Sequence, residues 1–411
     1  MSSAYAHTLG RENQLATFGK AQRGRLGLSL FFYFLAVPFV LHGYAMNLAL
    51  IYWNSMPVLV GFFLLWSLPM LRIRMKVDAE LFILLAAVAS TALPLLFGVN
   101  YIRDAIKYAL YFGAYYWLFK PYFSERRFYN GFLNIILFFL LTAYPLFLLD
   151  VVAGFDFHSA FRADDMLLPS QLKIVGKEDS ELYFPFYYYV VQNFKSWDLI
   201  EYSLVGIPRF YGFAHEPSSF AVVLLPLVII SHHLKRYGAM VILVVSMVLV
   251  SSYFSLMVMA LILPFLMIPE KRSAWIAMMM VAGVILVAFW DTFMSFIAQS
   301  QYTSRRYGNY MTKLDASFQF EVISSVNITD NEQRMSTASG ITHTLRYGMV
   351  STAAFISWAL LLLKRSIKPF RKHAILIIGA VMLLAQKSAA LYDPLLIFFL
   401  NYVNVVRKDL K

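Results

Sequence analysis

The longest uncharged stretch of the chain is YGAMVILVVSMVLVSSYFSLMVMALILPFLMIP, which runs from Tyr237 to Pro269. A basic pair precedes it (Lys235–Arg236) and another follows it (Lys271–Arg272). As one helix it would be about 50 Å long, whereas the hydrocarbon core of a bilayer is about 30 Å thick. Because Lys and Arg concentrate in cytoplasmic loops, both pairs are expected on the same side of the membrane. An even number of crossings follows, and we predict two short helices that separate near Ser251–Ser252, the only polar pair in the run.

The rest of the chain has the same apolar character. Of its 411 residues, 60% are hydrophobic and only 14% are charged, whereas an ordinary soluble domain carries about 25% charged residues. This composition excludes a soluble enzyme, a disordered chain and a nucleic-acid-binding domain as primary interpretations. The apolar runs are continuous rather than alternating, which favours helices over a transmembrane barrel. We therefore predict an all-α polytopic integral membrane protein with a single membrane domain, residues 1–411.

The positions of the charges predict the topology. The 35 Lys and Arg exceed the 23 Asp and Glu, for a formal net charge of +12, and the basic clusters alternate with apolar runs. With these clusters on the cytoplasmic side, we expect about 12 transmembrane helices and both termini in the cytoplasm. Two connections are much longer than the others, residues 151–216 and 291–343, and both fall on the outer, periplasmic side. Loops of this length are uncommon unless they are functional or disordered.

The first long loop ends in the sequence Arg209-Phe-Tyr211-Gly-Phe-Ala-His215-Glu216-Pro217, directly before an apolar run. Proline suits the first position of a helix, so a helix is predicted to begin at Pro217. The free N–H groups and the dipole of that helix end would favour an anion, and Arg209 and His215 add positive charge beside it. A second interpretation stays open, in which Glu216 is only a favourable acid at the start of a helix.

The second long loop carries further cationic side chains: Arg305, Arg306, Lys313, Arg334, His343 and, at its end, Arg346. Guanidinium binds phosphate through two parallel hydrogen bonds. If these arginines and Arg209 meet over one cavity, they form a pyrophosphate clamp. For Arg305 and Arg306 the alternative is that they contact lipid headgroups. Arg334 lies well inside the loop, which favours a functional role.

Several kinds of site have no counterpart in the sequence. The chain has no cysteine, no metal-ligand spacing, no phosphate-binding loop and no dinucleotide fingerprint, so neither a metal nor a cofactor is expected. The predicted spans have almost no charge in their interiors. Tyrosines near span ends, such as Tyr115 and Tyr116, are expected at the membrane interfaces, and His232 and His233 at the cytoplasmic one.

The pattern Arg209-x-x-Gly-x-x-x-Glu216-Pro217-Ser resembles the signature of Wzy-type polysaccharide repeat-unit polymerases, which belong with the O-antigen ligases in one membrane superfamily. The layout is similar too, with about 12 spans, two large periplasmic loops that carry arginines, and Arg334 before the span that follows the second loop. The resemblance covers the topology of the whole chain, but specific residues only at 209–221 and, more loosely, at 334–348.

The resemblance implies a GT-C-like fold and a metal-independent inverting glycosyltransferase in the bacterial inner membrane with a periplasmic active site. The donor would be a growing glycan on undecaprenyl pyrophosphate, and the acceptor a repeat unit on the same lipid. Arg209 and Arg334 would bind the pyrophosphates, and Glu216 or else His343 would accept the proton of the acceptor hydroxyl. Further candidate substrate-binding residues are Arg305, Arg306, Arg346, His215, Tyr211 and Arg162. The implied partners are membrane lipids, a flippase and a chain-length regulator, with no nucleic acid.

Three alternatives stay open. The first is an assembly subunit with no activity, which would leave the arginines of the outer loops hard to explain. An O-antigen ligase would transfer finished glycan to the lipid A core, and His215 and His343 fit the histidine-containing motif of that branch. A transporter of lipid-linked oligosaccharide would place ionisable groups near the middle of the bilayer and show repeat symmetry. The polar groups gather instead in two outer loops, which favours an enzyme that acts at the outer face.

Overall fold

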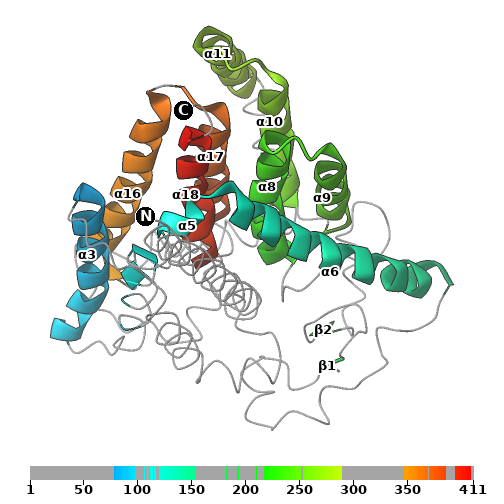
Figure 1. Ribbon diagram of the computed structural model, residues 1–411, viewed down its shortest axis with the longest axis horizontal. Coiled ribbons are helices and arrows are strands. Elements are labelled where there is room, and N and C mark those ends of the chain that lie inside the picture. Colours follow the sequence, from blue (N-terminus) through cyan, green and yellow to red (C-terminus); the bar gives the residue numbers. More distant parts are fainter. Residues whose placement is uncertain are drawn as a thin grey trace, which may run out of the picture.

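The computed structural model describes residues 78–97, isolated positions between 106 and 116, residues 120–153, 182–183, 192–193, 210, 217–250, 253–288, 347–368, 370–385 and 394–408. Nearly all of these residues are helical (Figure 1). The helices are α3 (Ala79–Ala92), η2 (Leu93–Phe97), α5 (Lys120–Phe123), α6 (Arg126–Ala153), α8 (Pro217–His233), α9 (Tyr237–Val250), α10 (Tyr253–Met267), α11 (Arg272–Ala288), α16 (Met349–Ile367), α17 (Lys372–Ala385) and α18 (Pro394–Lys408). Two short strands, β1 (Leu182–Tyr183) and β2 (Gln192–Asn193), pair in antiparallel register.

Three of the described helical segments are long and apolar enough to cross a membrane. They are Ala79–Leu96, Arg126–Leu149 and Met349–Ile367. Their length and composition indicate an α-helical protein that associates with a membrane, as the composition of the chain predicts. Other apolar helices, such as α9 and α17, are shorter.

The long uncharged run forms two helices, as predicted. α9 ends at Val250 and α10 begins at Tyr253, on either side of Ser251–Ser252. α9 packs along α8, and α10 contacts both of them. Because α9 runs away from Lys235–Arg236 and α10 runs back toward Lys271–Arg272, the two basic pairs return to the same end of the helices.

The starts of the helices follow from residue type. Asp78 precedes α3 in an extended conformation, and its carboxylate accepts a hydrogen bond of 3.0 Å from the backbone N–H of Leu81. This interaction satisfies one of the N–H groups that a helix start leaves free. α8 begins at Pro217, as predicted, and α18 begins at Pro394. Proline has no N–H to leave unpaired at this position.

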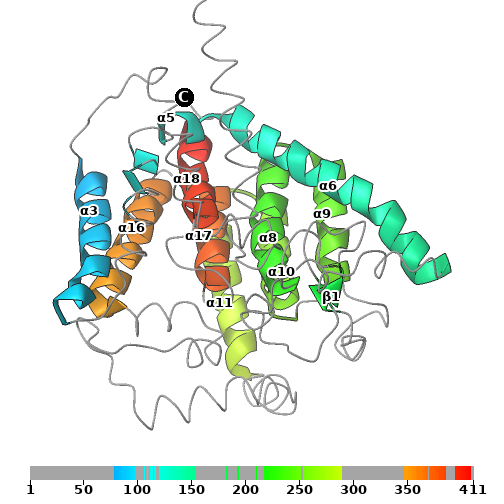
Figure 2. The same cartoon turned by 90° about the horizontal axis from the view of Figure 1, so that it is seen from below.

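The helices form a row in which neighbours in space are often distant in sequence. α3 packs on α16, α16 on α17, α17 on both α18 and α8, and α8 on α9. Figure 2 shows these helices side by side, with α6 slanting across α8 and α9. Aromatic rings from α6 and α18 fill one part of the core. Tyr129 stacks on Phe398 with ring centroids 4.4 Å apart, and its hydroxyl donates to the carbonyl of Phe398 at 2.9 Å.

One end of the row collects positive charge. Cations at this end donate hydrogen bonds to carbonyl oxygens that the helix ends leave free, and these bonds link neighbouring helices. Arg126 donates to Leu234 O beyond the end of α8 at 3.4 Å. Lys372 donates to Leu266 O in the last turn of α10 and to Ile268 O just beyond it, at 2.9 and 2.6 Å. The starts of α6 and α17 therefore lie beside the ends of α8 and α10.

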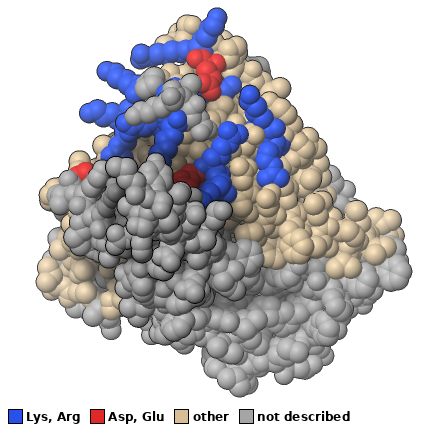
Figure 3. Space-filling view, viewed as in Figure 1, with Lys and Arg blue, Asp and Glu red and all other residues tan. Residues whose placement is uncertain are grey.

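We call this region the basic end, because every lysine and arginine that the structure describes belongs to it (Figure 3). They are Lys120, Arg126, Arg127, Lys235, Arg236, Lys271, Arg272, Lys364, Arg365, Lys368, Arg371, Lys372, Arg407 and Lys408. The basic clusters around the described apolar helices thus lie at one end, and the membrane topology predicted from them stays a prediction. Asp150, in the last turn of α6, is the one charged residue described away from the basic end.

Candidate functional site

All the residues predicted to act in catalysis or substrate binding lie outside the described part of the chain. They are Arg162, Arg209, Tyr211, His215, Glu216, Arg305, Arg306, Arg334, His343 and Arg346. Their mutual geometry stays a prediction. The structure does describe three residues that adjoin them in the sequence, namely Phe210, Pro217 and Tyr347.

The helices that follow the two long loops in the sequence, α8 and α16, both begin at the end opposite the basic end. α8 follows the first loop and runs from Pro217 to His233, beside Lys235 and Arg236. α16 follows the second loop and runs from Met349 to Ile367, with Lys364 and Arg365 in its last turn. Since both helices finish at the basic end, both begin at the other end. Pro217 and Met349 therefore lie at the same end of the described helices.

Phe210 anchors the predicted motif at that same end. Its side chain is completely buried, and its ring packs against Tyr144 and Phe147 of α6 and Phe220 of α8, with centroids 5.3, 5.2 and 6.1 Å apart. Its backbone N–H donates to the carbonyl of Leu249 in the last turn of α9 at 3.0 Å. Three helices thus hold the residue that lies between Arg209 and Tyr211.

Hydrogen bonds hold in place the Tyr144 ring that packs against Phe210. The Tyr144 hydroxyl is hydrogen-bonded to Ser246 Oγ of α9. Ser246 Oγ in turn donates to the carbonyl of Ile242 at 2.7 Å. These bonds connect α6 to α9 and fix the ring of Tyr144 beside Phe210. These bonds and the ring contacts give Phe210, the described residue of the motif before Pro217, a well-packed position between three helices.

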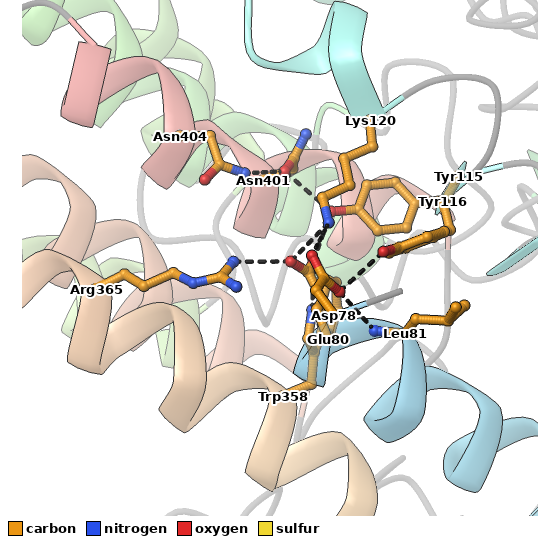
Figure 4. A network of polar contacts seen from close by, with 10 residues as sticks. All are labelled: Asp78, Glu80, Leu81, Tyr115, Tyr116, Lys120, Trp358, Arg365, Asn401 and Asn404. Carbon is orange, nitrogen blue, oxygen red and sulfur yellow. Dashed lines mark hydrogen bonds and ion pairs between the residues drawn. The ribbon is translucent and has the colours of Figure 1, made fainter. Parts of the chain in front are cut away.

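A second polar constellation lies at the basic end, where Glu80 of α3 is completely buried (Figure 4). Its Oε2 atom lies 2.9 Å from Lys120 Nζ and 2.7 Å from Arg365 Nη1. Its Oε1 atom accepts from the Tyr115 hydroxyl and from Trp358 Nε1, each at 3.1 Å. A buried carboxylate is tolerated when cations and hydrogen-bond donors surround it in this way.

Asp78 extends this network toward the surface (Figure 4). It accepts from the Tyr116 hydroxyl at 2.8 Å and lies 3.4 Å from Lys120 Nζ. Partial burial opposes ionisation, but the N–H of Leu81, the Tyr116 hydroxyl and the Lys120 charge outweigh it, so that the pKa of Asp78 is lowered. The charges of the two carboxylates, Asp78 and Glu80, balance those of the two cations, Lys120 and Arg365. We call these four residues and the side chains bonded to them the Glu80 network: Tyr115, Tyr116, Trp358 and Asn401.

An amide of α18 completes the network. The Tyr115 hydroxyl lies 3.1 Å from Glu80 Oε1 and 3.0 Å from Asn401 Oδ1, but it has one hydrogen and can donate to only one of them. The carboxylate is the stronger acceptor. The Asn401 side chain is completely buried, and its Nδ2 has no hydrogen-bond partner among the described residues. Asn401 Oδ1 also accepts a hydrogen bond from Asn404 Nδ2, so the amide oxygen keeps a donor when the Tyr115 proton goes to Glu80.

The Glu80 network joins elements that are far apart in the sequence. Its members come from the start of α3, the tyrosines before α5, the first residue of α5, the middle and last turn of α16 and the body of α18. Every carboxylate oxygen of Glu80 is occupied by side chains of the protein. The expectation that Tyr115 lies in an interfacial belt is wrong, because it is 2% exposed and points into this network.

Three histidines form another polar group at the basic end. His232 Nδ1 of α8 lies 2.9 Å from His373 Nε2 of α17, and His233 Nδ1 lies 2.6 Å from the Tyr402 hydroxyl of α18. His373 Nδ1 also lies 3.2 Å from Glu270 Oε1, just beyond α10. Within the described residues no group of His, Cys, Asp and Glu is arranged to hold a metal ion. The histidines thus connect α8, α10, α17 and α18.

Comparisons with protein-family models, with curated proteins and with solved structures gave no match for this chain. The functional argument therefore depends on the residues themselves.

Sequence reasoning missed the Glu80 network. The available signal was Asp78-x-Glu80 at the start of an apolar run, together with cations at the ends of two other runs, Lys120 and Arg365. Charges in such positions were interpreted only as markers of topology. An acid within the first turn of a membrane helix needs a partner, and that requirement could have prompted a search for one.

Proposed function

We propose that the chain is a repeat-unit polymerase of the Wzy type, which joins oligosaccharide units carried on undecaprenyl pyrophosphate at the periplasmic face of the bacterial inner membrane. The proposal includes about 12 membrane crossings, a GT-C-like arrangement and a cytoplasmic basic end. The resemblance at 209–221 suggests the activity. One structural observation supports its location: α8 and α16, which follow the two long loops, both begin at the end opposite the basic end.

The distribution of charge also supports the proposal. All described lysines and arginines lie at the basic end. In the proposed topology, Arg209 and Arg334 would stand at the other end, where they could meet anionic substrate groups. The start of α8 at Pro217 would add free N–H groups and the positive end of its dipole beside Glu216. This combination suits a pyrophosphate, the common anionic group of donor and acceptor.

The proposed reaction transfers a glycan without a metal ion. Glu216 accepts the proton of a hydroxyl on the acceptor repeat unit, and the resulting oxygen nucleophile attacks the anomeric carbon of the donor glycan. The bond from that carbon to the pyrophosphate oxygen breaks with inversion, and undecaprenyl pyrophosphate leaves with the electron pair. Arg209 and Arg334 stabilise the charge that develops on the leaving group. His343 is the second candidate for the base.

Reconstitution with a defined lipid-linked repeat unit tests the proposal. We expect the purified chain in vesicles to convert undecaprenyl-pyrophosphate-linked repeat units into a ladder of longer products. The variants Arg209→Ala, Glu216→Gln and Arg334→Ala should lose the ladder, with losses of at least about 100-fold. Arg407→Gln, which removes an exposed cation from the basic end, is the matched control and should keep it. A normal ladder from all three motif variants would contradict the proposed roles.

Two further assays separate the alternatives. An O-antigen ligase is the second candidate because His215 and His343 suit that branch. If glycan passes to a lipid A core acceptor while repeat units are never extended, the ligase assignment replaces the polymerase. If lipid-linked oligosaccharide crosses the vesicle membrane without any change in glycan length, the chain is a transporter.

A further inference from the structure

Two turns at the basic end form one patch of exposed positive charge. The turn between α10 and α11 carries Lys271 and Arg272, and the turn between α16 and α17 carries Lys368 and Arg371. We call these four residues the cationic patch. Lys271, Arg272 and Lys368 are exposed. No ion pair involving these four side chains is found among the described residues.

The contacts that hold the two turns together are made by residues outside the cationic patch. Lys372 donates to Ile268 O at 2.6 Å, and Glu270 lies 3.2 Å from His373. The Trp275 ring packs edge-on against Phe370, with centroids 5.2 Å apart. Glu270, the acid nearest to the patch in sequence, is thus directed to His373. The patch therefore has a defined shape and a strong excess of positive charge.

The backbone increases this excess. α11 begins at Arg272 and α17 at Lys372, and neither helix has an acidic residue in its first turn. The N-terminus of a helix carries a partial positive charge that favours an anion and disfavours a neighbouring cation. Both helix starts here have cations instead of acids beside them. An external anion would relieve that repulsion, and a phosphate group would also accept hydrogen bonds from guanidinium and ammonium groups.

An exposed apolar surface adjoins the patch. Beyond its first turn, α11 exposes Ile276, Met279, Met280 and Val284, each by more than half. Met280 lies eight positions after Arg272, which along a helix corresponds to about 12 Å. Charge at one end of a helix and an apolar face along it match an amphiphile with an anionic head and hydrocarbon tails. An acidic soluble protein would match only the charge.

We propose that the cationic patch and the exposed face of α11 bind an anionic phospholipid, with its phosphate at the two turns and its acyl chains along α11. Basic pockets between membrane helices recognise such headgroups. The lipid would connect α11, which contacts the other described helices only weakly, to the α16–α17 turn. The site lies at the end opposite the proposed catalytic loops and does not depend on the proposed polymerase activity.

Lipid titration of the full chain in detergent micelles tests the proposal, with native mass spectrometry as the readout. Short-chain phosphatidylglycerol should bind, and phosphatidylcholine should bind at least about tenfold more weakly. The variant Lys271→Gln/Lys368→Gln should weaken phosphatidylglycerol binding by about tenfold. The control Lys235→Gln/Arg407→Gln removes two charges from the same end but outside the patch, and should change binding by less than twofold.

Three results would overturn the proposal. Equal losses in the patch variant and the control would mean diffuse attraction to the whole basic end, and no loss in either would mean binding elsewhere. If inorganic phosphate or glycerol phosphate displaces the lipid at the lipid's own concentration, the site recognises a soluble phosphate and not a lipid. Because the substituted lysines are exposed, we expect unchanged thermal unfolding without lipid. Arg371→Gln offers a second, independent patch variant.

Discussion

Glu80 and Arg365 are separated by 285 positions in the chain, yet their Oε2 and Nη1 atoms lie 2.7 Å apart. The carboxylate stands in the first turn of α3 and the guanidinium in the last turn of α16, so the contact sets these two helices antiparallel. Lys120 reaches the same oxygen at 2.9 Å. One buried acid thus determines how the N-terminal part of the described chain docks on its C-terminal part.

Removing that acid should destabilise the protein strongly. In Glu80→Gln, the mostly buried Arg365 loses the carboxylate that balances it, and Lys120 keeps only Asp78 as an acidic partner. Breaking a buried pair in this way costs about 3–5 kcal/mol. We expect a clear fall in the temperature of thermal unfolding, measured in detergent with the protein's intrinsic fluorescence.

The matched control for this prediction is Glu125→Gln. Glu125 pairs with Arg127 at 2.6 Å, but both side chains are well exposed, and such pairs contribute about 0–1 kcal/mol. Equal unfolding temperatures for the two variants would show that the Glu80 network does not hold the helices together. In the double variant Glu80→Gln/Arg365→Gln part of the lost stability should return, because one unbalanced cation is gone.

Phe210→Ala should abolish polymer formation by loosening the base of the predicted motif. The ring fills a buried space between Tyr144, Phe147 and Phe220, and deleting such a ring costs about 3–5 kcal/mol. Phe210→Leu keeps most of the volume and should retain shortened chains. The readout is the product ladder, compared with the amount of protein in the membrane.

Phe138→Ala is the control for this loss. Phe138 belongs to α6, as do Tyr144 and Phe147, which pack on Phe210, but its side chain is 62% exposed. It should leave the ladder unchanged. If Phe210→Ala makes normal polymer, residue 210 does not position Arg209, although the resemblance at 209–221 would stand.

Local signals predicted three features of the described helices. The split of the long run around Ser251–Ser252 followed from the excess length of the run and from its two basic flanks, and the start of α8 followed from Pro217. Both arguments use only neighbouring residues and the thickness of a bilayer. The gathering of cations at one end followed from the same reasoning.

Long-range pairings could not be predicted in this way. Nothing in the residues around Glu80 specifies that its partners are Lys120 and Arg365, since that choice depends on how α3, α5 and α16 pack. For the same reason Tyr115 was placed at an interface although it is buried. The convergence of Arg209, Glu216 and Arg334 is a pairing of the same long-range kind, and it stays a prediction, as do about 12 crossings.

Lys372→Met should weaken the junction between α10 and α17. The Lys372 ammonium donates to two carbonyl oxygens, Leu266 O and Ile268 O, and hydrogen bonds that involve a charged group contribute about 1.5–3 kcal/mol. Methionine keeps the apolar stem but cannot donate. Hydrogen exchange should speed up in the last turn of α10. Lys271→Met, an exposed lysine in the adjoining turn, should leave the exchange rates there unchanged, and similar rates in both variants would contradict the capping role.

Acidification should unfold the protein partly through Asp78. Because the pKa of Asp78 is lowered in the folded state, its ionised form contributes stability at pH values above the ordinary pKa of about 4. That contribution disappears as the pH falls through the lowered value, where the folded protein must also take up the proton. Asp78→Asn keeps a side chain that can cap α3 but has no charge to titrate. We therefore expect the unfolding temperature of the variant to change less than that of the parent between pH 5 and pH 3, each taken as an approximate limit. Parallel pH profiles for the two proteins would show that the carboxylate of Asp78 gains nothing from Leu81, Tyr116 and Lys120 in the folded state.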